Sequence, residues 1–349
     1  MSYSDLKFGF FLPPAQSRIG NPSVALENTL QLIQRLDELG YEYAWLIDDP
    51  SPESLITGSP EVFIAAAIER TKTIKPGVAL TSAALQHPLA LADRLMQMNQ
   101  LAKGRITFCL GLDEVPSETT MHGRSSPDQR SWVLESLDVL LPLLQGETVS
   151  SNPSMFDLQE ARLKPGANTM IELALASQIS PAAARMAGTY GLGLVSISAT
   201  SAGGFDTLPL NWEIAERAAK KNLQSVDRKN WSLTGPVHIA ETNDQAFKDV
   251  TFGLADWVAY FREVAGLSIV PPGVKDPALW LVESGLAVIG TADDAIAQIR
   301  RLQEQSGGFG CFLQMGHNWA DREPSNKSIE LFARHVIPEF QSSRDPIRD

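Results

Sequence analysis

The sequence has few of the residues that mark disulfide, zinc and redox sites. Its 349 residues include two cysteines, Cys109 and Cys311, and five histidines. The cysteines form no CxxC pair, and because both lie in apolar runs we expect buried, inert thiols. The histidines show no metal-ligand spacing such as HExxH, so the sequence predicts no metal site.

Long apolar runs and clusters of basic residues are also missing. No apolar run reaches the roughly 20 residues of a transmembrane helix, and residues 1–7 lack the charged-then-apolar order of a signal peptide. The net charge is −12 and no stripe of Lys and Arg is visible, which argues against nucleic acid and anionic membranes as partners. These absences favour a cytoplasmic enzyme.

Two common catalytic motifs do not occur where their folds require them. The turn after the first apolar run reads FFLPPAQSRIG and lacks the GxGxxG fingerprint of an open dinucleotide-binding sheet. The chain has no GxSxG elbow, so serine-hydrolase chemistry of that kind is not supported.

Strand-like and helix-like patterns alternate along the whole chain. The strand-like runs are apolar throughout rather than alternating, as expected for parallel strands covered on both faces. They span residues 7–12, 42–47, 77–83, 105–112, 170–176, 194–198, 232–240 and 310–315. Helical spacing follows over residues 22–39, 60–70, 88–102, 127–144, 181–190, 210–222, 243–264, 292–305 and 325–340.

Eight strands with intervening helices predict an α/β fold with a parallel sheet. We expect one (β/α)8 TIM barrel over residues 1–349, rather than an open doubly wound sheet, because eight units suffice for closure. Two excursions, at residues 146–168 and 266–285, interrupt the alternation. Loop insertions at the C-terminal face of a barrel build its active site, so both excursions are expected there.

The segment after the predicted strand 170–176 is the best local candidate for a binding site. Ser180 and Pro181 fit the N-cap and first position of a helix. Free N–H groups and the positive dipole end at such a terminus favour an anion such as phosphate. Ser177 adds a hydroxyl, and Arg185 lies about one turn into the helix. The alternative is an ordinary helix cap.

Other candidate residues follow predicted strands. Asp48 and Asp49 come after strand 42–47, where a carboxylate can orient a substrate or act as a base, and the alternative is a solvent-exposed turn. His87 and His317 also lie at strand ends, and each is either functional or structural. The run Thr291 to Asp294 resembles a capping box, and we interpret it as structural.

Several stretches resemble the bacterial luciferase-like flavin monooxygenases. The most specific is AAAIERTKTIKPGVALTSAALQHPLALADRLMQMNQLAKGRITFCL, residues 65–110. Further stretches are residues 7–12, 39–46, 180–191 and 288–313. Residues 116–130 and the tail, 317–338, are similar to the limonene-monooxygenase-like branch. The resemblance covers nearly the whole chain and is weakest at residues 200–285.

The resemblance implies a barrel that binds FMN at the C-terminal ends of its strands. Two-component members receive reduced FMN from a separate NAD(P)H:flavin reductase, and O2 is the co-substrate. The family's phosphate region maps onto Ser177 and Ser180, with Arg185 nearby. Its non-proline cis peptide beneath the flavin ring falls at Ala79-Leu80, or nearby up to Ala83. The implied activity is oxygenation of an apolar organic substrate such as a terpenoid or polyketide.

Two departures from the family pattern affect the expected chemistry. Many members have Glu-His-His after the second strand, where this chain has Asp48-Asp49-Pro50. Either Asp49 takes that role, or His317 is the base, or no protein base is needed. Luciferase itself has an arginine for the phosphate where this chain has Leu112, so phosphate binding is weaker here or depends on Arg185.

Four aromatic residues are candidates for the substrate pocket, although each fits a hydrophobic core equally well. They are Phe10, Trp45, Phe108 and Trp319. Helices 60–71 and 88–102 are apolar nearly all round, and since a barrel helix needs only one buried stripe, they predict a homodimer interface of the kind the family uses.

Two other functions remain open at the level of sequence. One is a deazaflavin-dependent oxidoreductase on the same barrel, which transfers hydride without O2. The other is a non-catalytic flavin-binding barrel, which the missing His-His pair suggests.

Overall fold

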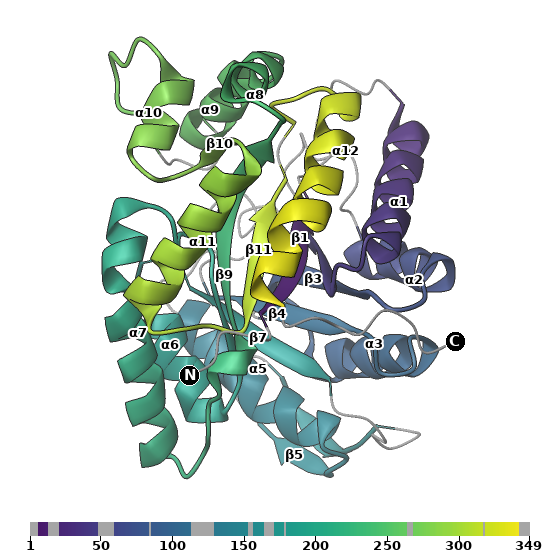
Figure 1. Cartoon of the computed structure of the whole chain (residues 1–349). Helices are drawn as coiled ribbons and strands as arrows, with labels where there is room; N and C mark the ends of the chain where they lie inside the picture. Colours follow the sequence, from purple (N-terminus) through teal and green to yellow (C-terminus); the bar gives the residue numbers. More distant parts are fainter. Residues whose placement is uncertain are drawn as a thin grey trace. The chain divides into compact units, whose positions relative to one another are not determined.

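A computed structural model describes residues 6–12, 21–47, 59–83, 85–112, 129–152, 156–163, 171–177, 179–263, 268–316 and 318–341 (Figure 1). The chain divides into two compact units. The larger unit comprises Met1–Pro13, Arg35–Ala44 and Ser177–Asp349, and the smaller unit comprises Pro14–Gln34 and Trp45–Ala176. Helix α1 (Pro22–Glu38) and strand β2 (Tyr43–Ile47) contribute residues to both.

The larger unit contains a parallel sheet built around its longest strand, β9. Its strands are β1 (Lys7–Leu12), β8 (Gly193–Ser196), β9 (Trp231–Ile239), β10 (Val288–Gly290) and β11 (Cys311–Met315). Along its first part β9 pairs with β8 on one side and β11 on the other, and β11 pairs in turn with β1. The last residues of β9, from Val237, pair with β10.

In the described part of the larger unit, seven α-helices lie after residue 177. They are α6 (Ala182–Tyr190), α7 (Ala202–Lys221), α8 (Asn243–Val250), α9 (Leu254–Glu263), α10 (Pro277–Glu283), α11 (Ala292–Ser306) and α12 (Arg322–Leu331). Helices α6 and α7 lie side by side (Figure 1). A Cβ on Gly188 of α6 would lie 2.1 Å from the carbonyl oxygen of Ala215, so glycine permits this close approach.

Aromatic side chains fill much of the larger unit's core. Phe8 of β1 packs edge-on against Phe332, which also stacks on Phe312 of β11. On β9, Trp231 stacks on Trp212, with ring centroids 4.9 Å apart. The Arg228 guanidinium lies over both indoles and donates to the carbonyl oxygens of Ser306 and Gly308, where α11 ends. Arg228 therefore makes cation–π contacts and also caps the C-terminal end of α11.

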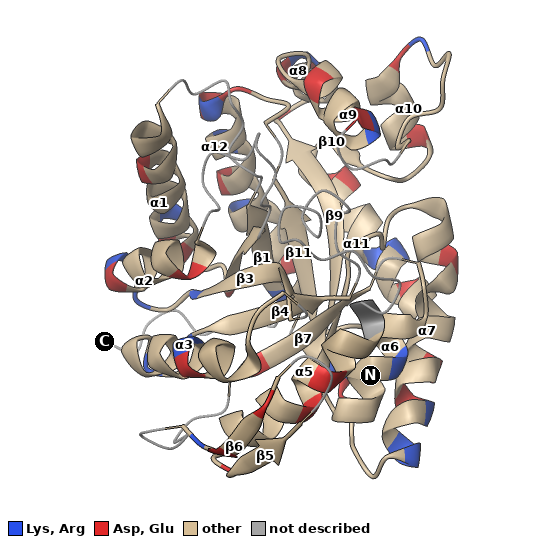
Figure 2. Cartoon of the chain, turned by 180° about the vertical axis from the view of Figure 1, so that it is seen from behind, with Lys and Arg blue, Asp and Glu red and all other residues tan. Residues whose placement is uncertain are grey.

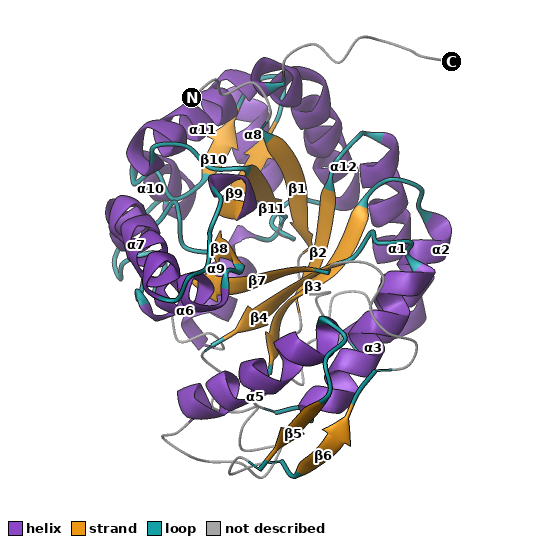
Figure 3. Ribbon diagram, turned by 90° about the horizontal axis from the view of Figure 1, so that it is seen from below, coloured by secondary structure: helices purple, strands orange, loops and turns teal. Residues whose placement is uncertain are grey.

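The smaller unit contains a parallel array of β3, β4 and β7 and a separate antiparallel hairpin. The strands of the array are β3 (Lys75–Ser82), β4 (Thr107–Gly111) and β7 (Glu172–Ser177), and the hairpin is β5 (Val149–Ser151) with β6 (Leu158–Ala161). The helices are α2 (Pro60–Arg70), α3 (Pro88–Leu101) and α5 (Gln129–Leu144), and α5 lies beside the hairpin (Figure 3).

All eight predicted strands are present, with ends within two residues of those expected. Charged positions lie mainly on the helices and the strands are almost free of them (Figure 2), which explains why apolar runs located the strands. The sequence missed β5, β6, β10 and α10, which are short, and it predicted 243–264 as one helix where the structure has α8 and α9. No described helix has the length and apolar character needed to cross a membrane.

Candidate functional site

Strand β3 contains an unusual backbone conformation at Leu80. Its φ is +68°, and the pairing register with β4 shifts between Ala79 and Thr81. The left-handed region costs an L-residue with a side chain about 1–2 kcal/mol, and such strain persists mainly where the surrounding structure enforces it, often at functional sites. Ala79 and Leu80 are the first of the positions, which run up to Ala83, at which the family resemblance implies a peptide beneath the flavin ring.

Glycine on the neighbouring strand makes room for this bulge. A Cβ on Gly111 of β4 would lie 3.1 Å from the Leu80 carbonyl oxygen, closer than most real Cβ contacts. A side chain at position 111 would therefore require the bulged peptide to shift by a few tenths of an ångström.

The predicted phosphate region lies at the end of β7 and the start of α6, within the larger unit. Ser177 is buried, and its hydroxyl lies 3.4 Å from the Ser180 carbonyl oxygen. Ser180 is exposed, and its Oγ accepts a long hydrogen bond of 3.4 Å from the Ala182 N–H. The helix begins one residue later than predicted, after Pro181 rather than at it.

The N-terminus of α6 has the properties of an anion site. The first N–H groups of a helix lack intrahelical partners and carry partial positive charge. The first turn has no acidic residue. Ala182 is half-buried there, and Ala183 and Ala184 are buried. Arg185 is exposed one turn further on.

The neighbouring helix α7 differs in how its first turn is satisfied. Ser201 caps it from its own chain, because the Ser201 hydroxyl accepts from the Gly204 N–H and donates to the Ser198 carbonyl oxygen. Ile179 covers this turn, with its Cδ1 atom 3.3 Å from where a Cβ on Gly203 would be. The hydrogen bond from the Gly204 N–H to Ser201 in α7 is 3.2 Å long, whereas that from the Ala182 N–H to Ser180 in α6 is 3.4 Å long.

The four aromatic candidates are all buried, none of them more than 3% exposed. Phe10 packs edge-on against Tyr41, with ring centroids 6.3 Å apart. Trp319 packs 5.0 Å from Trp257 in a hydrophobic cluster of the larger unit. Phe108 lies on β4. These contacts explain Phe10 and Trp319 as core residues, the alternative that the sequence left open, and a role of the four in a substrate pocket stays a prediction.

Trp45 of β2 differs from the other three because its polar atom is unsatisfied. Its side chain is buried, and the indole Nε1 has no hydrogen-bond partner among the described residues. Burying an N–H without an acceptor costs about 1–3 kcal/mol. A cofactor, substrate or water with an acceptor atom would remove this cost.

The two predicted catalytic residues, Asp49 and His317, lie outside the described residues, as does Asp48. The neighbours of position 317 are described. The Gly316 N–H donates to the Phe11 carbonyl oxygen over 3.0 Å, and the Trp319 carbonyl oxygen accepts from the Gly253 N–H over 2.9 Å.

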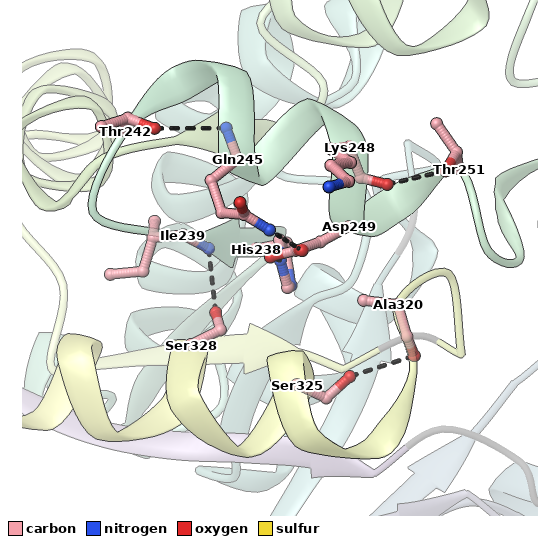
Figure 4. Close-up of polar contacts among 10 residues, drawn as sticks. All are labelled: His238, Ile239, Thr242, Gln245, Lys248, Asp249, Thr251, Ala320, Ser325 and Ser328. Atoms are coloured by element: carbon pink, nitrogen blue, oxygen red, sulfur yellow. Dashed lines mark hydrogen bonds and ion pairs between the residues drawn. The ribbon is translucent and has the colours of Figure 1, made fainter.

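A buried polar group at the end of β9 was not found from the sequence. His238 is 2% exposed, and its Nε2 lies 3.1 Å from Oδ2 of Asp249 on α8 (Figure 4). Gln245 donates to the other Asp249 oxygen over 2.6 Å. Burial lowers the pKa of His238 below its ordinary value, although the hydrogen bond with Asp249 acts in the opposite direction. No sequence motif joins these residues, because the contact depends on where α8 packs.

The remaining candidates from the sequence are held in contacts that stabilise the fold. His87 precedes α3 and packs edge-on against Phe156. Thr291 and Asp294 form the predicted capping box, in which the Thr291 N–H donates to the Asp294 carboxylate over 2.8 Å. Both cysteines are buried and free as predicted, and burial raises the pKa of Cys109 far above that of an ordinary thiol. The described residues contain no cluster of His, Cys, Asp and Glu suited to a metal ion.

The model of the luciferase-like monooxygenase family matches residues 6–308 of this chain. The chain belongs to that family. Limonene 1,2-monooxygenase of Rhodococcus erythropolis is 38% identical over 344 residues, which are 99% of this chain and 89% of that protein. The 4-hydroxyprotoasukamycin monooxygenase of Streptomyces nodosus subsp. asukaensis is 34% identical over 98% of this chain and 94% of its own.

A solved structure supports the fold. The oxygenating constituent of 3,6-diketocamphane monooxygenase from Pseudomonas putida, determined in complex with FMN, superposes with a TM-score of 0.82 at 23% identity and covers 96% of this chain and 99% of its own. The predicted (β/α)8 barrel fold class is confirmed. Family membership also confirms the predicted flavin-dependent monooxygenase.

Each unit contains features that a flavin cofactor would use. The start of α6 offers backbone N–H groups, two serine hydroxyls and a nearby arginine without a competing carboxylate. Within the smaller unit, the bulge at Leu80 sets β3 apart from a regular strand, and the Trp45 indole N–H has no acceptor among the described residues.

Proposed function

We propose that this protein is an FMNH2- and O2-dependent monooxygenase that inserts one oxygen atom into an apolar organic substrate such as a terpenoid or polyketide. The observation that carries the flavin part is the α6 terminus with Ser177 and Ser180. The substrate class is supported by the relative named for limonene, which is similar over 99% of the chain.

Each part of the cofactor has candidate partners in this chain. Ser177, Ser180 and the first N–H groups of α6 would hold the phosphate, with Arg185 as the balancing charge. The backbone at Ala79 and Leu80 would contact the ring. When bound, reduced FMN supplies the electrons that activate O2, and the protein's part is to orient the substrate and exclude water.

Proton handling falls to residues near the substrate. The Trp45 indole N–H is a buried donor suited to a carbonyl or hydroxyl oxygen of a ligand. Asp49 and His317 are the proposed acid–base residues.

A separate NAD(P)H:flavin reductase is the proposed source of reduced FMN. Arg185 and Ser180 are both exposed. The Ser180 hydroxyl accepts a long hydrogen bond, of 3.4 Å, from the Ala182 N–H. A phosphate site of this kind exchanges with solution readily, which suits an enzyme that takes up reduced flavin and releases oxidised flavin.

The activity test combines the purified chain with a flavin reductase, NADH, FMN and limonene, and measures oxygenated product and O2 consumption. The proposal predicts product that depends on this chain, with product formed per O2 consumed well above the value without it. Turnover with reduced deazaflavin but not with FMNH2 would select the hydride-transfer alternative. FMN binding without any turnover across a panel of terpenoids and polyketides would support the non-catalytic alternative.

We also propose a cytoplasmic homodimer formed through helices 60–71 and 88–102. In α2, Val62 is 70% exposed and Ala66 is exposed one turn away, which gives an apolar strip on the outer side of the helix. The exposed positions of α3 are mixed, with Ala90 and Leu101 beside polar residues. The outer face of α2 thus supplies the stronger support.

A further inference from the structure

One face of β4 lies against the bulged residue of β3. The pairing register with β4 passes from Ala79 directly to Thr81, so Leu80 is the additional residue between two paired positions. Cys109 and Gly111 are two residues apart on β4, and their side-chain positions therefore share a face of that strand. The Leu80 carbonyl oxygen lies on this face, 3.1 Å from where a Cβ on Gly111 would be.

The Cys109 sulfur contacts the other polar group of the Leu80 backbone. Burial raises the pKa of this thiol, and a hydrogen bond from the Leu80 backbone acts in the opposite direction. A backbone hydrogen bond lowers a thiol's pKa when an N–H donates to the sulfur, because the N–H stabilises the thiolate. Cys109 is fully buried, so its side chain has a fixed place beside this N–H. The N–H and the C=O of the bulged residue are thus directed at positions 109 and 111 of one strand.

A serine of α5 holds the other end of the same segment. Ser136 is 1% exposed, and its hydroxyl donates to the Ala83 carbonyl oxygen over 2.9 Å. A serine within a helix commonly bonds to a carbonyl of its own helix, but this one reaches a residue 53 positions earlier in the chain. Ala83 directly follows β3, so a buried side chain from a neighbouring element holds the segment at Leu80 and another holds it at Ala83.

Leu80 is also the accessible point of a buried stretch. Residues 77–79 and 81–83 are buried, whereas Leu80 is half-buried. A ligand can therefore reach this strand at the residue whose backbone has a left-handed φ. We call residues 79–83 the ring support, because the proposed function assigns the start of this segment to the flavin ring.

We propose that Cys109 and Ser136 are positioning residues that fix the ring support for the flavin. The inference rests on the proposed flavin-dependent function. Both residues act through the backbone of Leu80 and Ala83, and neither is a catalytic residue. A support that is already fixed before the cofactor binds loses less conformational entropy on binding, so it increases affinity for the ring. This contribution is separate from the phosphate site at α6.

Riboflavin, which has the ring but no phosphate, is the probe for this role. Cys109→Ala and Ser136→Ala are each expected to raise the Kd for riboflavin about fivefold, and the Kd for FMN by the same factor, as measured by flavin fluorescence. Cys109→Ser keeps an acceptor for the Leu80 N–H and is expected to stay within twofold of wild type. Unchanged riboflavin affinity in the folded alanine variants, or an equal loss in Cys109→Ser, would overturn the proposal.

Cys311→Ala and Ser328→Ala are the matched controls in the larger unit. Cys311 is a buried cysteine of β11, and Ser328 is a buried serine of α12 whose hydroxyl accepts from the Ile239 N–H over 2.9 Å. These variants remove the same atoms from equally buried places, and their Kd for riboflavin is expected to stay within twofold of wild type. Losses as large as those of Cys109→Ala and Ser136→Ala would show general loosening of the fold and overturn the proposal.

Hydrogen exchange of the wild-type protein tests the ring support without any substitution. Riboflavin is expected to slow exchange of the amides of residues 79–83 at least tenfold, while those of α8 keep their rate. Riboflavin that binds without protecting residues 79–83 would overturn the proposal and leave the proposed function in place. Protection of these amides in a protein that forms no oxygenated product would support the ring support and overturn only the proposed function.

Discussion

Leu80 adopts a local backbone conformation that its own chemistry does not explain. A leucine gains nothing from φ near +68°, and its neighbours on β3 are regular strand residues. The strain must therefore be offset by the rest of the structure, which is the pattern expected where a backbone is shaped for a ligand.

Comparing alanine and glycine at position 80 isolates this strain. Leu80→Ala and Leu80→Gly both remove the side chain beyond Cβ, but only alanine keeps the clash of a left-handed residue. We expect the glycine variant to be more stable to urea unfolding by about 1 kcal/mol. Ala79→Gly is the control and should destabilise instead, because Ala79 is buried and its φ is not in the left-handed region. If alanine and glycine had the same order of stability at position 80 as at position 79, the result would argue against strain at Leu80.

Ser180 tests the phosphate site at the level of one hydroxyl. Ser180→Ala should weaken FMN binding by about 1–2 kcal/mol if the hydroxyl contacts phosphate, or roughly five- to thirtyfold in Kd. Riboflavin, which lacks the phosphate, should bind wild type and variant equally. Thr189→Ala serves as the control. It removes a hydroxyl later in α6 that donates a hydrogen bond to the Arg185 carbonyl oxygen. Unchanged FMN affinity in a folded Ser180→Ala would reject the contact.

At the scale of elements, the burial of His238 where β9 meets α8 makes stability depend on pH. Because burial lowers the pKa of His238, the folded protein keeps this imidazole neutral below pH 6.5, where the unfolded chain takes up a proton. The stability that depends on the neutral form is fully present above pH 6.5 and is lost as pH falls through the lowered folded pKa.

Replacement of His238 by glutamine should therefore flatten this acid loss. We expect the free energy of unfolding of wild type to fall more between pH 7 and pH 5 than that of His238→Gln, as measured by urea titrations. His335→Gln, at an exposed position, is the control and should keep the wild-type slope. An equal slope in wild type and His238→Gln would contradict the role assigned to this pair.

The strands and the start of α6 were predictable because their signals are local. Buried parallel strands need continuous apolar runs, and Ser180 with Pro181 marks the start of α6. The break between helices α8 and α9 was not predictable. A Cβ on Gly253, which lies at this break, would be 2.1 Å from the carbonyl oxygen of Asn318, 65 residues further along the chain. For the same reason the sequence offered no sign of the His238–Asp249 contact.

For the aromatic candidates, the sequence did not decide between a substrate pocket and the hydrophobic core. Phe10 lies within an expected strand and Trp319 follows one, yet a residue near a strand end can face either a pocket or the surrounding helices. Tertiary contacts decide this, and they place Phe10 against Tyr41 and Trp319 against Trp257. Trp45 retains the stronger link to a ligand because its N–H is unsatisfied.

For the whole molecule, the proposed homodimer can be tested on its outer surface. Val62→Asp should leave the fold intact, because Val62 is 70% exposed, but it should give a monomer by light scattering at micromolar concentration. Leu223→Asp, at a position 95% exposed in the larger unit, should leave the dimer unchanged. A monomeric wild type would show that the apolar strip on α2 serves another purpose.

The most direct test of the monooxygenase function is a titration of the protein with reduced FMN without oxygen, followed by rapid mixing with O2. The account predicts a stable complex in which the bound flavin reoxidises more slowly than free flavin, through an absorbance change that free flavin does not show. Failure to bind reduced FMN, or reoxidation at the rate of free flavin, would contradict it.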